Sequence, residues 1–319
     1  MAPPVAIAVV SWNTRALLRA CLQSISPEVA AGRVEAWVVD NASSDDSAAL
    51  VRVEFPWAHL IASRSNLGFG AAVNLVAART RSPWIGVANA DVELTPGALQ
   101  ALVDAGARDP AVGILAPRLL LPDGSTQHSV YPFPTLAFAL AFNLGLAGLS
   151  PRLADRLALE GRWNPDRARS VDWAIGAFLL VRRAAWDAVG GFDSRQWMYA
   201  EDLDLGWRAA AAGWRTRYEP AAIVRHHGAA AASQRWGEDR DAQWQRSTYA
   251  WMLRRRGASA TRTFALLNSA GAGARLLLLT PRALMLGGDA WARWLVMRRW
   301  TRLHLGNLLA PRATLEHHR

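Results

Sequence analysis

The first 120 or so residues alternate between short apolar runs typical of strands and apolar residues at helical spacing. The strand-like runs lie at Val5–Ser11, Val34–Asp40, His59–Ala62, 84–88 and 112–117, and the helical patterns lie at 14–25, 45–54, 71–79 and 96–108. Each helix carries the chain back along the sheet, so consecutive strands pair in parallel. This order predicts an α/β fold with a Rossmann-like, doubly wound and mostly parallel sheet.

The rest of the chain is less regular. Prolines and glycines are frequent at residues 121–170, where we expect a loop-rich insertion with short helices. Regular patterns return as a strand at 171–181 and helices at 183–189 and 201–212. We therefore expect one α/β domain over residues 1–251 and a helical extension over residues 252–319.

Positive charge is concentrated in this extension. The formal net charge is +10, and all 36 cationic side chains are arginines, because the sequence contains no lysine. Residues 252–319 hold 12 arginines and only Asp289 and Glu316 as acids, whereas residues 1–251 hold 24 of each sign. Such an excess suits nucleic acid, anionic lipid or another anionic ligand, and charge alone does not choose among them.

Tryptophans alternate with arginines in the extension, as at Trp291, Arg293, Trp294, Arg298 and Trp300. This mixture suits the headgroup zone of an anionic membrane. The helical wheel gives no single apolar face, however, and packing of the extension on the α/β domain is the alternative.

Composition excludes several other classes of protein. Hydrophobic residues make up 51% of the chain and charged residues 19%, which is typical of a packed globular protein. The single cysteine, Cys21, excludes an intrachain disulfide and a cysteine-rich metal cage, and it fits a reducing compartment. No apolar run reaches the roughly 18 residues that cross a bilayer, and the first apolar run is too short for a signal peptide, so we expect no spanning helix.

Two strand-like runs end in carboxylates. Asp40 ends the second run, and Asp91 follows Asn89 just after the fourth. Ligands of parallel sheets bind at the carboxyl ends of strands, which favours a binding role over a simple turn for this pair. Asp91 is suited to a hard divalent cation that takes its other ligands from phosphate and water. For Asp45, which precedes a helical pattern, we favour a helix cap.

The stretch from Asn66 to Gly70 lies between a strand and a helix and contains Gly68. Backbone amides in such a turn can approach an anion closely. A tight turn capped by Asn66 is an equally good explanation.

Three acids fall within four positions at Glu201, Asp202 and Asp204. Crowding raises the proton affinity of at least one carboxylate and suits a general base, whereas acids in the first turn of a helix also stabilise its dipole. The spacing of Asp204 and Arg208 predicts an ion pair within the helix. His226 and His227 follow a strand-like run; structural roles are common for such a pair, and one imidazole is compatible with Mg²⁺ or Mn²⁺.

The strings VVDNASSDDS, NLGFGAAVN, NADVEL and GAFLLVRRAAWDAVGGFDSRQWMYAEDLDLGWRAAAAGW occur in one order over about 200 residues. Together they resemble glycosyltransferase family 2, and within it the bacterial rhamnosyltransferase-like subgroup. The resemblance implies a GT-A fold over residues 1–251 and transfer of a sugar from a nucleotide diphosphate with inversion at the anomeric carbon. The extension lies outside its strongest part.

The resemblance also implies roles for individual residues. On the donor side it assigns the nucleobase contact to Asp40, a nearby position to Asn13, the last acid of a DxD-like motif to Asp91, and the donor loop to Gly68 and Asn74. Asn89 replaces the first acid of that motif. On the acceptor side it assigns the general base to Asp202, with Glu201 as its neighbour, and it makes His226 a second ligand of a Mg²⁺ or Mn²⁺ ion.

The implied substrates are dTDP-L-rhamnose as first choice of donor, UDP-sugars next, and a glycan or polyprenyl-diphosphate-linked glycan of the cell envelope as acceptor. A cytoplasmic enzyme, peripheral on the inner face of the plasma membrane, would fit. A nicotinamide-dependent oxidoreductase is excluded, since residues 11–14 after the first strand lack the glycine fingerprint. A non-enzymatic protein that binds nucleic acid or membrane through its basic extension is the rival from another class.

Overall fold

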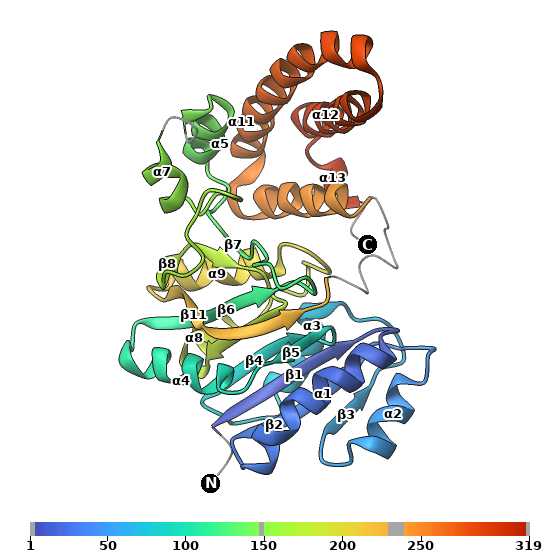
Figure 1. Ribbon diagram of the computed structural model, residues 1–319, viewed down its shortest axis with the longest axis vertical. Coiled ribbons are helices and arrows are strands. Elements are labelled where there is room, and N and C mark those ends of the chain that lie inside the picture. Colours follow the sequence, from blue (N-terminus) through green and yellow to red (C-terminus); the bar gives the residue numbers. More distant parts are fainter. Residues whose placement is uncertain (1–3, 147–149, 229–238, 317–319) are drawn as a thin grey trace. The chain divides into compact units, whose positions relative to one another are not determined.

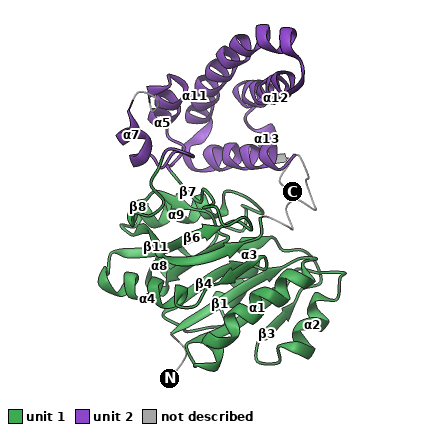
Figure 2. Ribbon diagram, in the orientation of Figure 1, with its two compact units in different colours: residues 1–131, 163–237 green, residues 132–162, 238–319 purple. Residues whose placement is uncertain are grey.

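The computed structural model of the chain describes residues 4–146, 150–228 and 239–316. Contacts divide the chain into two compact units, shown in Figure 2. The first comprises Met1–Tyr131 and Trp163–Gly237, and the second comprises Pro132–Arg162 and Glu238–Arg319. The helical unit thus includes part of the loop-rich stretch as well as the extension. The boundary expected at residue 251, between the α/β domain and the extension, stays a prediction.

The first unit is built on one large sheet, labelled in Figure 1. Its strands follow the order β3-β2-β1-β4-β10-β6-β11-β5, with β8 beside β11, and β7 pairs with β9 in a small separate sheet. The bounds are β1 Val5–Ser11, β2 Val34–Asp40, β3 His59–Ala62, β4 Trp84–Asn89, β5 Val92–Leu94, β6 Val112–Leu120, β7 Val130–Tyr131, β8 Arg169–Val171, β9 Trp173–Ala174, β10 Phe178–Arg182 and β11 Arg215–His226. The first four strands of this order pair in parallel, as predicted, and β10 is antiparallel to both of its neighbours.

The helices of this unit are α1 Arg15–Ala30, α2 Ser47–Glu54, α3 Phe69–Ala77, α4 Ala98–Arg108, α8 Arg183–Val189 and α9 Glu201–Ala211. The expected helices are present. The N-cap residue of α2 is Asp46 rather than Asp45, although the Asp45 carboxylate accepts from the first amides of two helices, Arg15 N–H at 2.8 Å and Ser47 N–H at 3.2 Å. The single strand expected at 171–181 is instead divided among β8, β9 and β10. Prediction failed there because apolar character continues through the turns that separate the three strands.

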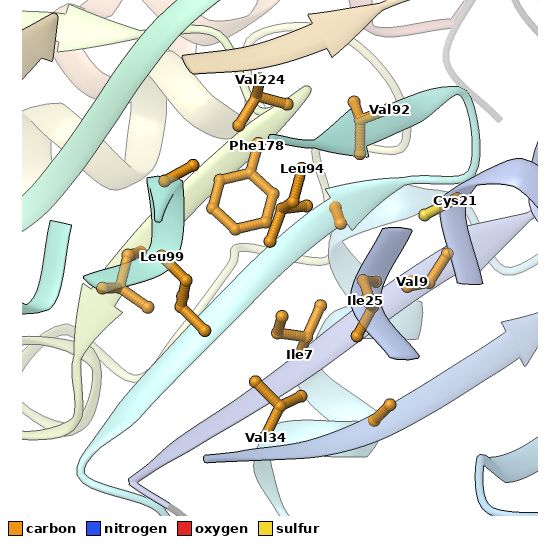
Figure 3. Close-up of a cluster of buried hydrophobic side chains, with 14 of the residues drawn as sticks. Ile7, Val9, Cys21, Ile25, Val34, Val92, Leu94, Leu99, Phe178 and Val224 are labelled. Carbon is orange, nitrogen blue, oxygen red and sulfur yellow. The ribbon is translucent and has the colours of Figure 1, made fainter. Parts of the chain in front are cut away.

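One face of the sheet carries a hydrophobic cluster that Figure 3 shows in close-up. Ile7 and Val9 of β1 pack there with Ile25 of α1, Leu99 of α4 and Phe178 of β10, all of them buried. Side chains alternate between the two faces of a strand, so the intervening residues of β1 point to the opposite face, where α3 contacts β1. Helices therefore cover both faces and leave the strand ends open for a site.

The second unit consists of α5 Leu136–Asn143, α7 Pro151–Arg156, α11 Arg240–Leu286, α12 Gly288–Leu309 and α13 Ala313–Glu316. Gly257 interrupts α11 with a left-handed φ of 79°, so α11 comprises two helical segments. α12 packs on both of them: the Tyr249 hydroxyl lies 2.8 Å from His304 Nδ1, and Trp294 Nε1 donates to Thr280 Oγ1 at 3.0 Å. Burial lowers the pKa of His304 to about 4, so this imidazole is neutral inside the unit.

By length and composition, α11 could cross a membrane. Its best 18-residue window has a mean hydropathy of 1.2, and 28% of that window is buried inside the protein. The sequence analysis expected no such helix because it searched for uninterrupted apolar runs. The mean hydropathy of an 18-residue window can be high even when the window contains a few polar residues. Only the length and the composition of α11 indicate that it could cross a membrane.

Candidate active site

The carboxyl ends of β1 and β2 place Asn13 and Asp40 in one corner. Ser11 and Asp40 are register partners, so the residues that follow β1 lie beside the end of β2. Asp40 is buried, and its Oδ2 accepts from Ser43 N–H at 3.2 Å. Its Oδ1 is also buried and has no hydrogen-bond partner among the described residues. A buried acceptor in this state suits a ligand that brings its own N–H donor.

Asn13 links the two loops of this corner. Its N–H donates to Ser43 Oγ at 2.9 Å, and its side-chain Oδ1 accepts from Ser44 N–H at 2.8 Å. Its backbone is left-handed with a φ of 52°, a conformation that asparagine tolerates better than most residues. Asn13 therefore shapes the wall around Asp40.

The loop before α3 is held by a residue that the sequence analysis missed. Asn41 accepts from Leu67 N–H at 3.4 Å and donates to the Gly68 carbonyl at 3.3 Å. Gly68 has a φ of 80°, and a Cβ there would lie 2.4 Å from the Trp197 carbonyl oxygen. Only glycine allows this approach between the loop and the segment that precedes α9.

Asn74 has a supporting position behind this loop. Its Nδ2 donates to the Phe192 carbonyl at 2.8 Å, and its Oδ1 accepts from Phe192 N–H at 3.0 Å. The amide thus pairs with backbone that leads into α9. A direct contact of Asn74 with the nucleotide-sugar donor stays a prediction. The observed hydrogen bonds show that Asn74 holds the backbone at Phe192 in position.

Antiparallel pairing of β5 with β11 brings His226 to Asp91. His226 is the register partner of Val92, and its Nε2 lies 3.3 Å from Asp91 Oδ1. Both side chains are buried, with 4% and 5% exposed. His227 faces away and lies 2.6 Å from Glu93. Of the two histidines, His226 is therefore the one in the site.

The hydrogen bonds of His226 suit a cation. Its Nδ1 lies 2.7 Å from Gln127 Oε1, an oxygen that can only accept, so the ring proton belongs on Nδ1. In the neutral ring, Nε2 then directs a lone pair at a carboxylate oxygen, and a cation between them turns this repulsion into attraction. No cluster of three such ligands occurs in residues 4–146, 150–228 and 239–316. The pair fits a Mg²⁺ or Mn²⁺ ion that completes its shell with phosphate and water.

Asp202 lies in the first turn of α9 with its carboxylate fixed at both oxygens. Oδ2 accepts from Gly176 N–H at 2.9 Å, and Oδ1 accepts from Leu203 N–H at 2.8 Å. Burial raises the pKa of Asp202 to about 6, and the backbone donors offset part of that increase. At neutral pH this group is ionised yet basic enough to accept a proton.

Glu201 is the neighbour of Asp202 at the start of α9. Burial, and then the charge of Asp202, raise the pKa of Glu201 well above its usual value. Its Oε2 is buried without a hydrogen-bond partner in the described part of the chain. Asp204 is structural, as expected, because it is fully buried and pairs with Arg208 at 2.6 Å.

The residues before β10 connect Asp202 to the strand end that leads to Asp91. Gly176 donates to Asp202, and the next residue, Ala177, accepts from Asn89 N–H at 2.9 Å. The ends of β2 and β4 are separated only by β1, a spacing of about 10 Å. Asp40 and Asp91 therefore lie at one edge of the sheet, and Asp202 of α9 is tied to it through Gly176.

Comparison with known proteins identifies the family of the chain. A model described as glycosyltransferase like family 2 matches residues 3–247. The chain belongs to this family. It is 33% identical over 261 residues to the N-acetylglucosaminyl-diphospho-decaprenol L-rhamnosyltransferase of Mycobacterium tuberculosis H37Rv, covering 74% of this chain and 84% of that protein. It is also 35% identical over 102 residues to rhamnosyltransferase WbbL of Escherichia coli K12, which is 32% of this chain and 35% of that protein.

Solved structures confirm the predicted GT-A fold. The mannosyltransferase PcManGT from Pyrobaculum calidifontis, in complex with GDP-Man and Mn²⁺, superposes with a TM-score of 0.58 at 20% identity, covering 98% of this chain and 88% of that chain. GalNAc-T7 with UDP, GalNAc and Mn²⁺ gives 0.52 at 11% identity, covering 77% and 51%. The family 2 chain is thus a glycosyltransferase, and the non-enzymatic rival is set aside.

Proposed function

We propose that this glycosyltransferase transfers L-rhamnose, with inversion, from dTDP-L-rhamnose to a polyprenyl-diphosphate-linked glycan of the cell envelope. The observation that carries the proposal is that Asp40 and Asp91 lie at one sheet edge and that hydrogen bonds link Asp202 to this edge. Gly176 N–H donates to Asp202, and the carbonyl of the next residue, Ala177, accepts from Asn89 N–H. Their spacing suits a nucleobase, a diphosphate and a reacting sugar in that order.

The donor side begins at Asp40. Its unpartnered buried Oδ1 suits the imide N–H that thymine and uracil share. Asn13 and Gly68 shape the pocket around the nucleoside, and Asn74 supports the loop from behind. This chemistry accepts dTDP or UDP, so a UDP-sugar is the alternative donor. The rhamnosyltransferase names of two relatives favour rhamnose.

Asp91 and His226 would hold the divalent cation, with Asn89 beside them. When bound, the cation would neutralise charge that develops on the leaving diphosphate. Gln127 fixes the ring of His226 by accepting from Nδ1. The two structural relatives contain Mn²⁺, which supports a divalent ion and leaves Mg²⁺ as an equal choice.

Asp202 would take the proton from the acceptor hydroxyl. Its pKa of about 6 keeps it ionised at neutral pH, and its two backbone donors hold the carboxylate in place. Burial and the neighbouring charge raise the pKa of Glu201, so its proton is held more tightly than that of an ordinary glutamate. One base and one direct displacement predict inversion at the anomeric carbon, whereas retention by double displacement requires a second, nucleophilic carboxylate.

The acceptor and the location follow from the relatives and from the helical unit. The mycobacterial relative is named for a diphospho-decaprenol acceptor, which supports a lipid-linked acceptor here. The helical unit exposes large apolar side chains, among them Leu277, Leu278, Leu284, Met285 and Leu286. These side chains support peripheral attachment to the cytoplasmic face of the membrane.

A panel of donors tests the proposal. dTDP-L-rhamnose and several UDP-sugars would be offered with a prenyl-diphosphate-linked N-acetylglucosamine, with and without a chelator, to the parent, to Asp202→Asn and to Asp104→Asn. Asp104 is an exposed acid of α4 and serves as the matched control. We expect chelator-sensitive transfer of rhamnose that falls about 10³-fold in Asp202→Asn while dTDP binding survives. Turnover that persists in Asp202→Asn contradicts the assignment of the base.

A further inference from the structure

The helical unit contains a cavity of about 550 Å³ to which the proposed function assigns no residue, and the inference drawn from it deepens that proposed function. It lies between the first segment of α11, one face of α12, and α13. Four guanidinium groups line it, those of Arg246, Arg298, Arg299 and Arg302. All of its lining residues belong to the helical unit, so the cavity is defined within that unit alone.

The positive charge of this cavity is largely uncompensated. Arg299 pairs with Asp239, and Arg298 lies over the Trp294 ring at 5.6 Å. For Arg246 and Arg302 there is no ion pair within the described ranges, which omit residues 229–238 and 317–319. Four like charges around one concavity repel one another, and this repulsion is relieved when a multiply charged anion enters.

The same cavity has an apolar side. Leu295 and Leu303 line it with the arginines, and Leu295 is 43% exposed. Residues 295, 298, 299, 302 and 303 recur at helical spacing, so they share one face of α12. Trp291, four residues before Leu295 on this face, is also exposed. Arg302 lies about 16 Å further along the helix axis than Trp291, so this face offers both charged and apolar side chains over that length.

We infer that this cavity binds the phosphate groups of an amphiphilic ligand. Arginine forks match phosphate oxygens in bidentate hydrogen bonds, and the exposed apolar side chains of α12 accept a hydrocarbon chain. A concavity of this size holds one headgroup, whereas nucleic acid needs an extended basic surface. Two sources supply the same chemistry, a prenyl diphosphate and an anionic phospholipid headgroup.

Direct binding tests the inference without any sugar donor. Farnesyl diphosphate is titrated calorimetrically into the full chain with a chelator present, so that the diphosphate cannot bind through a cation at the active site. Vesicles of phosphatidylglycerol, and of phosphatidylcholine as the neutral control, are tested by flotation. The variants are Arg246→Gln and Arg302→Gln, with Arg293→Gln as the matched control from an exposed position of α12 outside the cavity. Glutamine preserves helix propensity, and circular dichroism checks folding.

We expect each cavity variant to bind farnesyl diphosphate about tenfold more weakly, with the control unchanged. If vesicle binding instead shows this pattern, the phospholipid headgroup is the source. If the parent binds neither probe, or if all three arginine variants weaken binding equally, the inference is overturned, since general surface charge then explains the result. Binding that persists in Asp202→Asn separates this site from the proposed catalytic one.

Discussion

Replacing Asp202 by asparagine is expected to stabilise the fold at neutral pH while it abolishes transfer. Burial holds the pKa of Asp202 at about 6, against an ordinary value of 3.8. The folded state therefore binds the proton more tightly than the unfolded state does. This contribution to stability is fully present below about pH 4 and is lost as the pH rises through 6, where ionisation costs about 3 kcal/mol.

Asparagine does not titrate, so the variant escapes this cost. Its amide cannot accept from both Gly176 N–H and Leu203 N–H, and the lost hydrogen bond costs about 1 kcal/mol at every pH. The pH-dependent part is the useful measure. From about pH 5 to about pH 8, the free energy of unfolding of the parent should fall by between about 1 and about 2 kcal/mol relative to the variant.

Urea denaturation followed by tryptophan fluorescence at a series of pH values measures this difference. Asp104→Asn, which removes an exposed carboxylate, should track the parent throughout. Parallel curves for the parent and Asp202→Asn would refute the reasoning, because they would mean that this carboxylate has an ordinary pKa and is no better a base than a surface acid.

Three further predictions concern the same site. The rate of transfer should fall below about pH 6 as Asp202 takes up its proton. Glu201→Gln should keep this midpoint, because burial is the main cause of the raised pKa of Asp202; a shift toward pH 4 would contradict this. Gln127→Leu should weaken Mn²⁺ binding about 10- to 100-fold in calorimetry by releasing His226, with nucleotide binding in chelator unchanged. Gly68→Ala should lower donor affinity and thermal stability together, because its methyl group meets a backbone carbonyl; normal affinity would show that the loop tolerates the change.

The sequence predicted the parallel part of the fold well because its signal is local. Buried strands such as Val5–Ser11 and Val34–Asp40 are continuous apolar runs, and the alternation with helices defines how they pair. The three-residue strand β5 Val92–Leu94 was missed, since so short a run shows no periodicity. The three strands between residues 169 and 182 were predicted as one strand, because the segments that separate them are short and mostly apolar.

The candidate site divides in the same way. Asp40 and Asp91 could be predicted as site residues because each lies at or just after the end of a recognisable strand. Asn41 was available beside Asp40, but its partners lie 26 and 27 residues away. Gln127 lies 99 residues from His226, and no local pattern connects them. Residues that hold other residues in place depend on tertiary contacts, and a single sequence does not encode these in any local spacing.

The short bridge of Gly176 and Ala177 has a consequence for how such an enzyme can diversify. Consecutive peptide groups anchor both Asp202 and the strand end that leads to Asp91, so in the proposed mechanism the backbone itself defines the line of attack on the anomeric carbon. New sugar preferences must then arise in side chains that touch the hexose ring, and new acceptors in surfaces further out. The preferred sugar and acceptor can then change during evolution while the backbone that holds Asp202 stays the same.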